Sequence, residues 1–427
     1  MNADPHSMGT KWRETLQKVV PCCVVLKVTS TRSFDTESAG SSFATGFVVD
    51  RERGLILTNR HVVKPGPITA EAVFLNREEL PVYPLYRDPI HDFGFMRFDP
   101  KQLRFMEFGE VPLAPEAAQV GIEIRVVGND SGEKVSILAG TLARLDRDAP
   151  TYSSRGFNDF NTFYLQAASG TKGGSSGSPV IDVHGRAIGL NAGSKTKTAS
   201  AFFLPLDRVV RALEICRGCC VVDAEGEGKT TWLAPDIPRG DLQATFIFKG
   251  FDEVKRLGLK PETEEMVRNA KRRKTESQVG MLVVDSRVPE GPSDGKLEPG
   301  DVLVSINGAT VTHFLDLEAT LDSNVGKEVT VRVARGNEML TYQVRVQDLH
   351  QVTPDAFLES SGGSIHALSY QQARNFSTPT GQVYVAEPGY LLSRAGIPKH
   401  SVILSVQGKP TPNLEALAKV MSHIPGG

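Results

Sequence analysis

Three short segments of the chain carry side chains that could act together as a nucleophile, a base and an orienting acid. Residues 173–179, with the sequence GGSSGSP, form a small-residue loop that presents serine hydroxyls. Residues 58–63, TNRHVV, follow an apolar stretch and contain His61, and residues 87–95, RDPIHDFGF, offer carboxylates. A serine hydroxyl is a weak nucleophile near neutral pH, and a neighbouring imidazole that takes its proton activates it. These residue types indicate nucleophilic catalysis by a serine.

Ser176 is the candidate nucleophile because it alone in this loop has glycine both two positions before it and one position after it. Gly174 lets the backbone turn, so that its N–H and that of Ser176 can converge on one point as an oxyanion hole. Ser175 and Ser178 lack this spacing. A Ser/Gly-rich surface turn is the alternative for the loop alone, and its combination with a histidine and an aspartate favours catalysis.

His61 is the candidate base, and Asp92 is the candidate acid that orients it. His61 follows an apolar strand and lies at its polar end, although a buried core histidine is the usual alternative. Asp92 opens a short apolar strand and is well placed to be partly buried against an imidazole N–H. Asp88 precedes a proline and is expected in a turn. His91 is expected to face solvent, because neighbouring residues of an extended strand point to opposite faces.

The chain order is histidine, aspartate, serine, which is the order of chymotrypsin-like double-barrel proteases and not of subtilisins or α/β-hydrolases. This order predicts a peptide-bond hydrolase. An esterase is the weaker alternative, since no strand–elbow–helix pattern surrounds Ser176. In chymotrypsin-like folds the residue six positions before the nucleophile lies at the floor of the substrate pocket, and here it is Gly170. A glycine there predicts an uncharged pocket for small or medium apolar side chains.

An all-β domain must position these residues. Short apolar segments alternate with Gly, Pro and Asp turns at 23–26, 45–49, 54–58 and 123–127, which fits a sandwich or paired barrels. A helix with an apolar stripe ends this domain at about residue 213. We expect a protease domain over residues 1–222, a linker over 223–234, and two further domains over 235–349 and 350–427.

The second half of the chain repeats itself. Residues 297–308 return as residues 397–408 at a constant offset of 100, and each copy precedes a helical pattern. A repeat of this length indicates two copies of one small domain, not a solenoid. The first copy continues through two more strands, at 327–334 and 341–346, which the second copy lacks. Because a domain without its closing strands would expose an unpaired edge, we expect the chain to be an N-terminal piece of a longer protein.

The three motifs resemble the signatures of the HtrA/Deg branch of trypsin-like serine proteases, T-N-x-H-V, a D-x-A strand and G-N-S-G-G. Ser175 stands for the usual Asn and Ser178 for the usual Gly, and neither change removes a triad or oxyanion group. The resemblance covers the whole chain, because HtrA proteases carry PDZ domains after the protease. Residues 128–140 are similar to a long intracellular sub-branch known from plants (protease Do-like) and fungi (nuclear HtrA-like).

This resemblance implies a mainly β fold, a chymotrypsin-like double β-barrel protease domain followed by PDZ-like α+β domains. It also implies an ATP-independent serine endopeptidase that cleaves unfolded or damaged proteins. A peptide-binding scaffold or holdase with a vestigial protease domain is the alternative. In either case the expected partners are unfolded proteins or peptides.

Residues 251–259 of the first repeat resemble the carboxylate-binding loop of HtrA PDZ domains. The backbone N–H groups of Leu257, Gly258 and Leu259 could capture a peptide C-terminus while the peptide adds a strand to the sheet. A helix followed by a glycine cap is the alternative. The second repeat has no comparable loop, since residues 366–370 occupy the region.

Composition excludes several classes of protein. A formal net charge of −2 with 40% hydrophobic residues gives no reason to expect nucleic acid or a membrane surface as partner. Residues 1–20 contain no apolar core of a secretory signal, and no apolar run approaches the roughly 18–20 residues of a membrane span. The sequence leaves the oligomeric state open, including a homo-oligomer.

The cysteines favour an intracellular location. There are five of them, an odd number, and no second pair has zinc-type spacing. We therefore expect reduced thiols, no metal and no cofactor, in the nucleus, the plastid stroma or the cytoplasm. The basic run at 271–274 is either a nuclear import signal or, preferably, a solvated loop.

Overall fold

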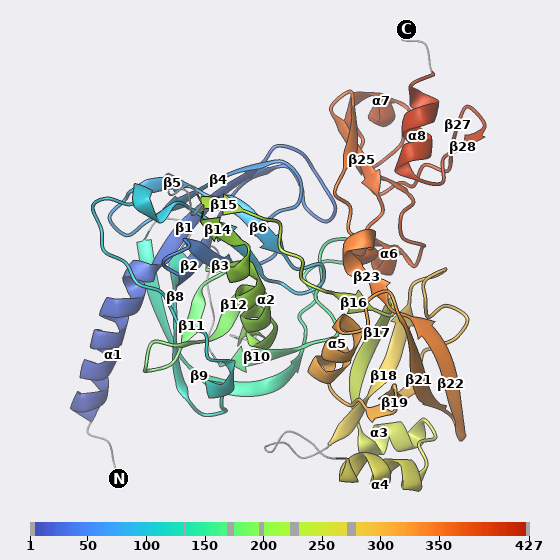
Figure 1. The fold of residues 1–427 in the computed structure, drawn as a ribbon, viewed down its shortest axis with the longest axis horizontal. Helices are drawn as coiled ribbons and strands as arrows, with labels where there is room; N and C mark the ends of the chain where they lie inside the picture. The colour runs from blue at the N-terminus through green and yellow to red at the C-terminus, as the bar shows by residue number, and fades with distance from the viewer. Residues whose placement is uncertain are drawn as a thin grey trace. The chain divides into compact units, whose positions relative to one another are not determined.

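The computed structural model describes residues 5–130, 134–168, 175–195, 200–222, 230–270 and 279–423 (Figure 1). The chain divides into two compact units. The first unit comprises Met1–Arg32, Glu37–Pro150 and Phe163–Ile237, and the second comprises Ser33–Thr36, Thr151–Thr162 and Pro238–Gly427. Each unit has its own sheets and core, and the two are described separately.

The first unit opens with a seven-stranded antiparallel sheet in the order β5-β4-β1-β2-β3-β7-β6. Its strands are β1 (Cys23–Ser30), β2 (Gly40–Asp50), β3 (Leu55–Thr58), β4 (Ile68–Val73), β5 (Glu79–Pro81), β6 (Tyr83–Arg87) and β7 (Gly94–Arg97). The expected strands at 23–26, 45–49 and 54–58 are confirmed as β1, β2 and β3. All four residues of β3 are buried, as expected for a short apolar run between two neighbours.

Six further strands close into a barrel in the order β10-β13-β12-β11-β8-β9. They are β8 (Glu123–Asp130), β9 (Lys134–Asp148), β10 (Phe163–Ala167), β11 (Pro179–Ile181), β12 (Ala187–Lys195) and β13 (Ser200–Pro205). Helix α1 (Pro5–Val19) is attached to β8, where Trp12 Nε1 donates to a Glu123 carboxylate oxygen at 3.1 Å. The expected helix at the end of the domain is α2 (Asp207–Gly218). Short 3₁₀ turns η1 (Val20–Cys22), η2 (Pro100–Gln102) and η3 (Pro115–Ala117) complete the unit.

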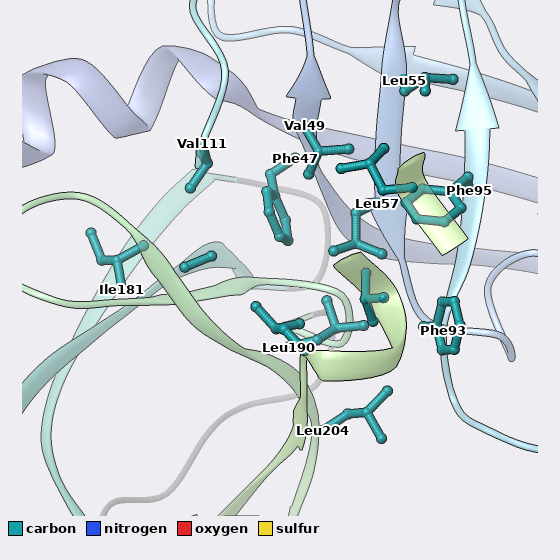
Figure 2. Packing of buried hydrophobic residues seen from close by; sticks show 14 of the residues in the cluster. Phe47, Val49, Leu55, Leu57, Phe93, Phe95, Val111, Ile181, Leu190 and Leu204 are labelled. Atoms are coloured by element: carbon teal, nitrogen blue, oxygen red, sulfur yellow. The ribbon is translucent and has the colours of Figure 1, made fainter. Parts of the chain in front are cut away.

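One apolar core joins the sheet to the barrel. Phe47, Leu57 and Phe95 of the sheet gather in the same cluster as Ile181, Leu190 and Leu204 of the barrel (Figure 2). These six side chains are completely buried. Because removing apolar surface from water is the main favourable contribution to folding, this shared core fixes the two β structures against each other.

The end of the first unit departs from the expected linker at 223–234. Strand β14 (Cys220–Val222) pairs antiparallel with β15 (Thr230–Trp232), so residues 230–232 belong to a strand of the first unit. Residues 223–229 lie outside the described residues. The polar composition of this stretch predicted its loop character and gave no signal of the short strand after it.

In the second unit the first repeat is built on the sheet β17-β18-β19-β21-β22. Its elements are β16 (Gly240–Asp241), β17 (Ala244–Gly250), α3 (Phe251–Arg256), α4 (Pro261–Asn269), β18 (Gly280–Arg287), β19 (Val302–Ile306), β20 (Ala309–Thr310), α5 (Phe314–Asp322), β21 (Glu328–Arg335), β22 (Glu338–Arg345) and β23 (Gln347–Asp348). The strands expected at 327–334 and 341–346 are β21 and β22. The basic run at 271–274 lies outside the described residues.

The second repeat follows the turn η5 (Leu349–Val352). Its elements are β24 (Phe357–Ser360), β25 (Gly363–Ala367), α6 (Tyr370–Phe376), β26 (Val383–Glu387), α7 (Gly389–Arg394), β27 (Ser405–Val406), β28 (Lys409–Pro410) and α8 (Leu414–Met421). Strands β24, β25 and β26 form one sheet, and β27 pairs with β28.

The backbone shares the internal repeat seen in the sequence. Asn307 and Gly308 have φ angles of 50° and 81°, and their counterparts Gln407 and Gly408 have 50° and 75°. Two consecutive positive φ angles define the type I′ hairpin turn that an Asn-Gly pair favours. The two copies differ beside β19. In the first copy β19 pairs with β21 and Val304 is buried, whereas its counterpart Leu404 in the second copy is 71% exposed.

The five cysteines are all free, and Cys22, Cys23 and Cys216 are buried. Burial raises the pKa of the Cys216 thiol to about 12, which keeps it protonated and unreactive at neutral pH. Across the described residues no helix is long and apolar enough to cross a membrane. Within the same residues no cluster of three metal-ligating side chains occurs.

Candidate active site

The structure brings His61 and Asp92 together. His61 follows strand β3, and its Nδ1 lies 2.9 Å from Oδ1 and 3.0 Å from Oδ2 of Asp92. The backbone N–H of His61 also donates to Asp92 Oδ1 at 3.2 Å. Asp92 is completely buried, whereas the His61 side chain keeps a third of its surface exposed. A buried carboxylate therefore holds one ring nitrogen, and the other remains available for a proton transfer.

A tight turn after β3 sets the position of His61. The backbone N–H groups of Val62 and Val63 both donate to the Asn59 carbonyl at 3.1 Å, which closes the turn around His61. The Asn59 side chain reaches across to the acid, because its Nδ2 donates to the Asp92 carbonyl at 3.0 Å. Asn59 is completely buried, so the turn that carries the base and the turn that carries the acid are joined inside the core.

The segment before Asp92 is a turn and not a strand. Asp88 Oδ1 accepts hydrogen bonds from the N–H groups of Ile90 at 2.9 Å and His91 at 2.7 Å, as expected for an aspartate that initiates a turn. The expectation that His91 faces solvent is wrong, since its side chain is only 2% exposed. The alternation of faces holds for extended strands, and it does not apply to residues in a turn.

Exposure distinguishes the three serines of residues 175–178, the nucleophile loop. Ser175 and Ser178 are buried, and Ser178 Oγ donates to the Ser175 carbonyl at 2.6 Å. Asn191 Nδ2 donates to the Ser175 carbonyl at 2.7 Å and to its Oγ at 3.1 Å. Ser176 is only partly buried. The two neighbouring serines thus hold the loop together, and Ser176 is the one whose hydroxyl a substrate could reach.

Thr45 ties this loop to the strand that precedes the base. Its backbone N–H donates to the Ser176 carbonyl at 2.8 Å, and its carbonyl accepts from Thr58 Oγ1 at 2.8 Å. Gly177 makes the approach possible, because its φ is +83° and a Cβ there would lie 2.1 Å from the Thr45 carbonyl oxygen. Ser176 and His61 are therefore both anchored to the end of β3.

The electrostatic environment of His61 favours the proton-accepting role predicted for it. Burial of the ring lowers its pKa, but the charge of Asp92, its hydrogen bond and the charge of Glu37 outweigh burial. The pKa of His61 is therefore raised above its ordinary value of 6.5. A more basic imidazole is a stronger acceptor for the proton of a serine hydroxyl.

Two of the predicted site residues lie outside the described residues. Gly170, the expected pocket floor, and Gly174, an expected oxyanion donor, both fall in the segment 169–174. Their roles remain predictions from the sequence.

The three amides expected to bind a peptide carboxylate are engaged in a helix cap. After α3, the N–H of Gly258 donates to the Lys255 carbonyl at 2.9 Å, and the N–H of Leu259 donates to the Val254 carbonyl at 3.1 Å. The Leu257 N–H also bonds helix carbonyls, and Gly258 has φ +95°. This is a Schellman motif, so the structure favours the helix-cap alternative. Amides that satisfy helix carbonyls do not face an incoming carboxylate.

Sequence reasoning missed the residues that join the parts of the site. Asn59 lies in the motif that contains His61, but its bond to the Asp92 carbonyl depends on a contact distant in sequence. Thr45 and Asn191 carry no motif of their own. Their roles depend on strand register and could be recognised only once the sheet and the barrel were in place.

Comparisons with known proteins agree with this architecture. Residues 44–190 match the model of the trypsin-like peptidase domain, residues 256–346 match the PDZ domain, and residues 351–426 match the PDZ-like domain. "Protease Do-like 7" of Arabidopsis thaliana is 61% identical over 97% of this chain and 37% of its own length. "Pro-apoptotic serine protease nma111" of Aspergillus terreus is 49% identical over 97% of this chain and 38% of its own length.

Solved structures share the fold. The HtrA-type protease AlgW with a tripeptide has a TM-score of 0.52 at 19% identity, over 79% of this chain and 96% of its own. A serine endoprotease from Yersinia pestis has a TM-score of 0.51 at 14% identity, over 79% of this chain and 98% of its own. At these identities the likeness concerns the fold alone.

A trypsin-like domain followed by two PDZ-type repeats defines the architecture of a PDZ-containing serine protease. The chain belongs to the HtrA/Deg-type trypsin-like serine proteases, together with its plant Do-like and fungal nma111 relatives. It spans less than two-fifths of the length of these two relatives.

Proposed function

We propose that this chain is an ATP-independent serine endopeptidase that cleaves unfolded or damaged proteins. The observation that supports this best is the buried Asp92 carboxylate on Nδ1 of His61, together with residues 175–178, where Ser175 and Ser178 are buried and Ser176 is partly exposed. A vestigial domain would have no need to keep a buried, paired carboxylate, because burying a charge is costly unless it is compensated.

The proposed reaction uses these residues together with Gly174, whose role is predicted from the sequence. Ser176 Oγ attacks the substrate carbonyl carbon, and Nε2 of His61 takes the hydroxyl proton while Asp92 holds Nδ1–H. The N–H groups of Gly174 and Ser176 stabilise the oxyanion, with each such donor contributing about 3 kcal/mol to the barrier reduction. His61 then passes its proton to the leaving amine. Water repeats the sequence on the acyl-enzyme and releases the second product.

Labelling with a fluorophosphonate probe, followed by mass spectrometry, tests the nucleophile directly. We expect the label on Ser176 and degradation of unfolded casein by the wild type. Ser176→Ala should lose both, with a cost of several orders of magnitude in rate. Ser178→Ala is the matched control: it removes a bond that holds the same loop but keeps the attacking hydroxyl, so it should still take the label, at a reduced rate.

Two outcomes would overturn the assignment. Casein degradation retained by Ser176→Ala would move the nucleophile to a neighbouring serine. A wild type that takes no label and cleaves no casein, but suppresses the aggregation of unfolded proteins, would favour the holdase alternative.

The proposed substrate preference is an uncharged side chain before the cleaved bond. Gly170 supports it, because a cationic side chain would need a buried acidic partner at the pocket floor. Sites mapped by mass spectrometry in digested casein should follow Val, Ala, Leu or similar residues. Cleavage concentrated after Lys and Arg would contradict this assignment.

We also propose peptide binding at the first repeat and an intracellular location in the nucleus or plastid stroma. The PDZ match and the AlgW structures with a tripeptide and a decapeptide support peptide binding. The plant and fungal relatives support the intracellular location. Calorimetry with free-acid and amidated peptides tests the binding. A large preference for the free acid would return a carboxylate role to Leu257, Gly258 and Leu259 through rearrangement of the cap.

A further inference from the structure

A buried arginine precedes the catalytic histidine. Arg60 is only 1% exposed and is one of the largest completely buried side chains of the described residues. A guanidinium remains charged in a protein interior, and burying it is costly unless its donors are satisfied. Its Nε donates to the Asp88 carbonyl at 2.8 Å. This placement requires an explanation that ordinary core packing does not supply.

The segment that Arg60 holds is the turn that leads to Asp92. The Asp88 carboxylate is itself fixed by three donors, the N–H groups of Ile90 and His91 and the hydroxyl of Tyr86 at 3.0 Å. These bonds make residues 88–91 a rigid turn. Arg60 therefore binds the first residue of a turn that is followed directly by Asp92, the proposed triad acid.

A second bond holds the other end of the same turn. Asn59, the residue before Arg60 in the chain, donates from its Nδ2 to the Asp92 carbonyl at 3.0 Å. Consecutive residues 59, 60 and 61 thus contact residues 88 and 92 through two backbone carbonyls and one catalytic carboxylate. Two anchors fix the distance between the strand that carries the base and the turn that carries the acid.

We infer that Arg60 is a positioning residue of this protease, which holds the Asp88 turn so that the Asp92 carboxylate stays aligned with His61. The inference rests on the proposed peptidase function. A displacement of about 1 Å in a catalytic group can cost about 100-fold in rate, so such an anchor affects turnover more than binding.

The charge of Arg60 provides a second effect that ordinary packing would not have. Burial lowers the pKa of His61, Asp92 and Glu37 raise it, and Arg60 lowers it. Removing the arginine charge should therefore raise the pKa of His61 further. This charge acts on the pKa of His61 whether or not Arg60 positions the turn, so the pKa reports the charge of Arg60 and kcat reports its positioning role.

The test measures the His61 pKa by NMR in the full chain, in a Ser176→Ala background. We expect Arg60→Met to raise the pKa of His61 and Arg60→Lys, which keeps the charge, to leave it near that of the parent. Arg239→Met, which removes another buried arginine, in the second unit, is the control and should not move it. Because this background is inactive by design, the measurement stands even if the peptidase proposal fails.

In the active chain, Arg60→Met should lower kcat by about 10- to 100-fold with little change in KM. Arg60→Lys should recover part of kcat. If Arg60→Met does not fold, Asn59→Ala takes its place, with a lower kcat and a lowered pKa of His61, because Asp92 is displaced while no charge is removed. The proposal is overturned if folded Arg60→Met has the wild-type kcat or, where that variant does not fold, if Asn59→Ala has the wild-type kcat.

Discussion

At the residue scale, the proposed mechanism makes activity depend on the protonation state of His61. The imidazole must be neutral to accept the proton of Ser176, and the pKa of His61 is raised above 6.5 because Asp92 and Glu37 outweigh the effect of burial. Activity should therefore increase as pH rises through this elevated pKa. The acidic limb of kcat/KM for an unfolded substrate should have its midpoint above pH 6.5.

The matched variant for this pH prediction is Asp92→Asn. It removes the charge that raises the His61 pKa and favours the wrong tautomer, so the rate should fall by roughly 10⁴-fold and the remaining acidic limb should shift to lower pH. A wild-type midpoint below pH 6.5, or an Asp92→Asn profile that does not shift, would contradict this account of the pair.

Single residues also show how far the sequence predicts the site. Glycine spacing selected Ser176, and its neighbours Ser175 and Ser178 are buried in loop contacts, which supports that choice independently. The orientation of His91 could not be predicted, because only the hydrogen bonds of Asp88 show that the segment is a turn. Local spacing identifies chemistry, whereas the direction of a side chain depends on the backbone around it.

At the element scale, Gly177 lets the nucleophile loop approach β2 and β3. Gly177→Ala would place a Cβ 2.1 Å from the Thr45 carbonyl oxygen and 2.4 Å from Thr58 Oγ1, at a φ of +83°. The loop must shift to relieve this clash, and Ser176 shifts with it. We expect proteolysis to fall by more than about 100-fold, together with loss of fluorophosphonate labelling.

The control for Gly177 is Gly121→Ala. Gly121 has a comparable φ of +92° with nothing within 4 Å of the added Cβ, so it carries the backbone strain without the clash. It should lose about 1 kcal/mol of unfolding free energy and keep its activity. Labelling of Gly177→Ala at the wild-type rate would show that the loop does not depend on this close approach.

Elements were predictable where their signals are local. The strands β1, β2, β3 and β8 follow from apolar runs between turn residues. Strand β15 was missed because three residues after a polar stretch carry no periodicity. The carboxylate loop and the helix cap share one sequence, and only the hydrogen bonds of the amides distinguish them.

At the scale of the whole molecule, the offset of 100 residues predicted two related domains after the protease, and the two PDZ matches confirm them. How those repeats are joined could not be predicted. Asp241 on β16 accepts a hydrogen bond from Tyr370 Oη, at the start of α6 in the second repeat, at 2.7 Å. Both residues are buried, so the link between the repeats contains an ionisable group inside the unit.

The pKa of Asp241 predicts how this link responds to pH. Burial raises it from 3.8 to about 6, although the hydrogen bonds from Tyr370 and the Gln243 N–H lower it. Between these values the folded state holds a proton that the unfolded state has released. This group's contribution to stability is therefore largest at low pH and is lost as pH rises through about 6, by about 3 kcal/mol at most.

Asp241→Asn keeps the shape and the acceptor oxygen but removes the titration. Relative to wild type, the variant should gain about 2 kcal/mol of stability between pH 4.5 and pH 8 in urea unfolding of the full chain. Hydrogen exchange should assign this gain to the second unit. Tyr370→Phe removes a donor to the charged carboxylate, so it should destabilise more at pH 8 than at pH 4.5. If the stability difference between Asp241→Asn and wild type is the same at pH 4.5 and pH 8, folding does not raise the pKa of Asp241 from 3.8 to about 6. The pH response would then come from other groups.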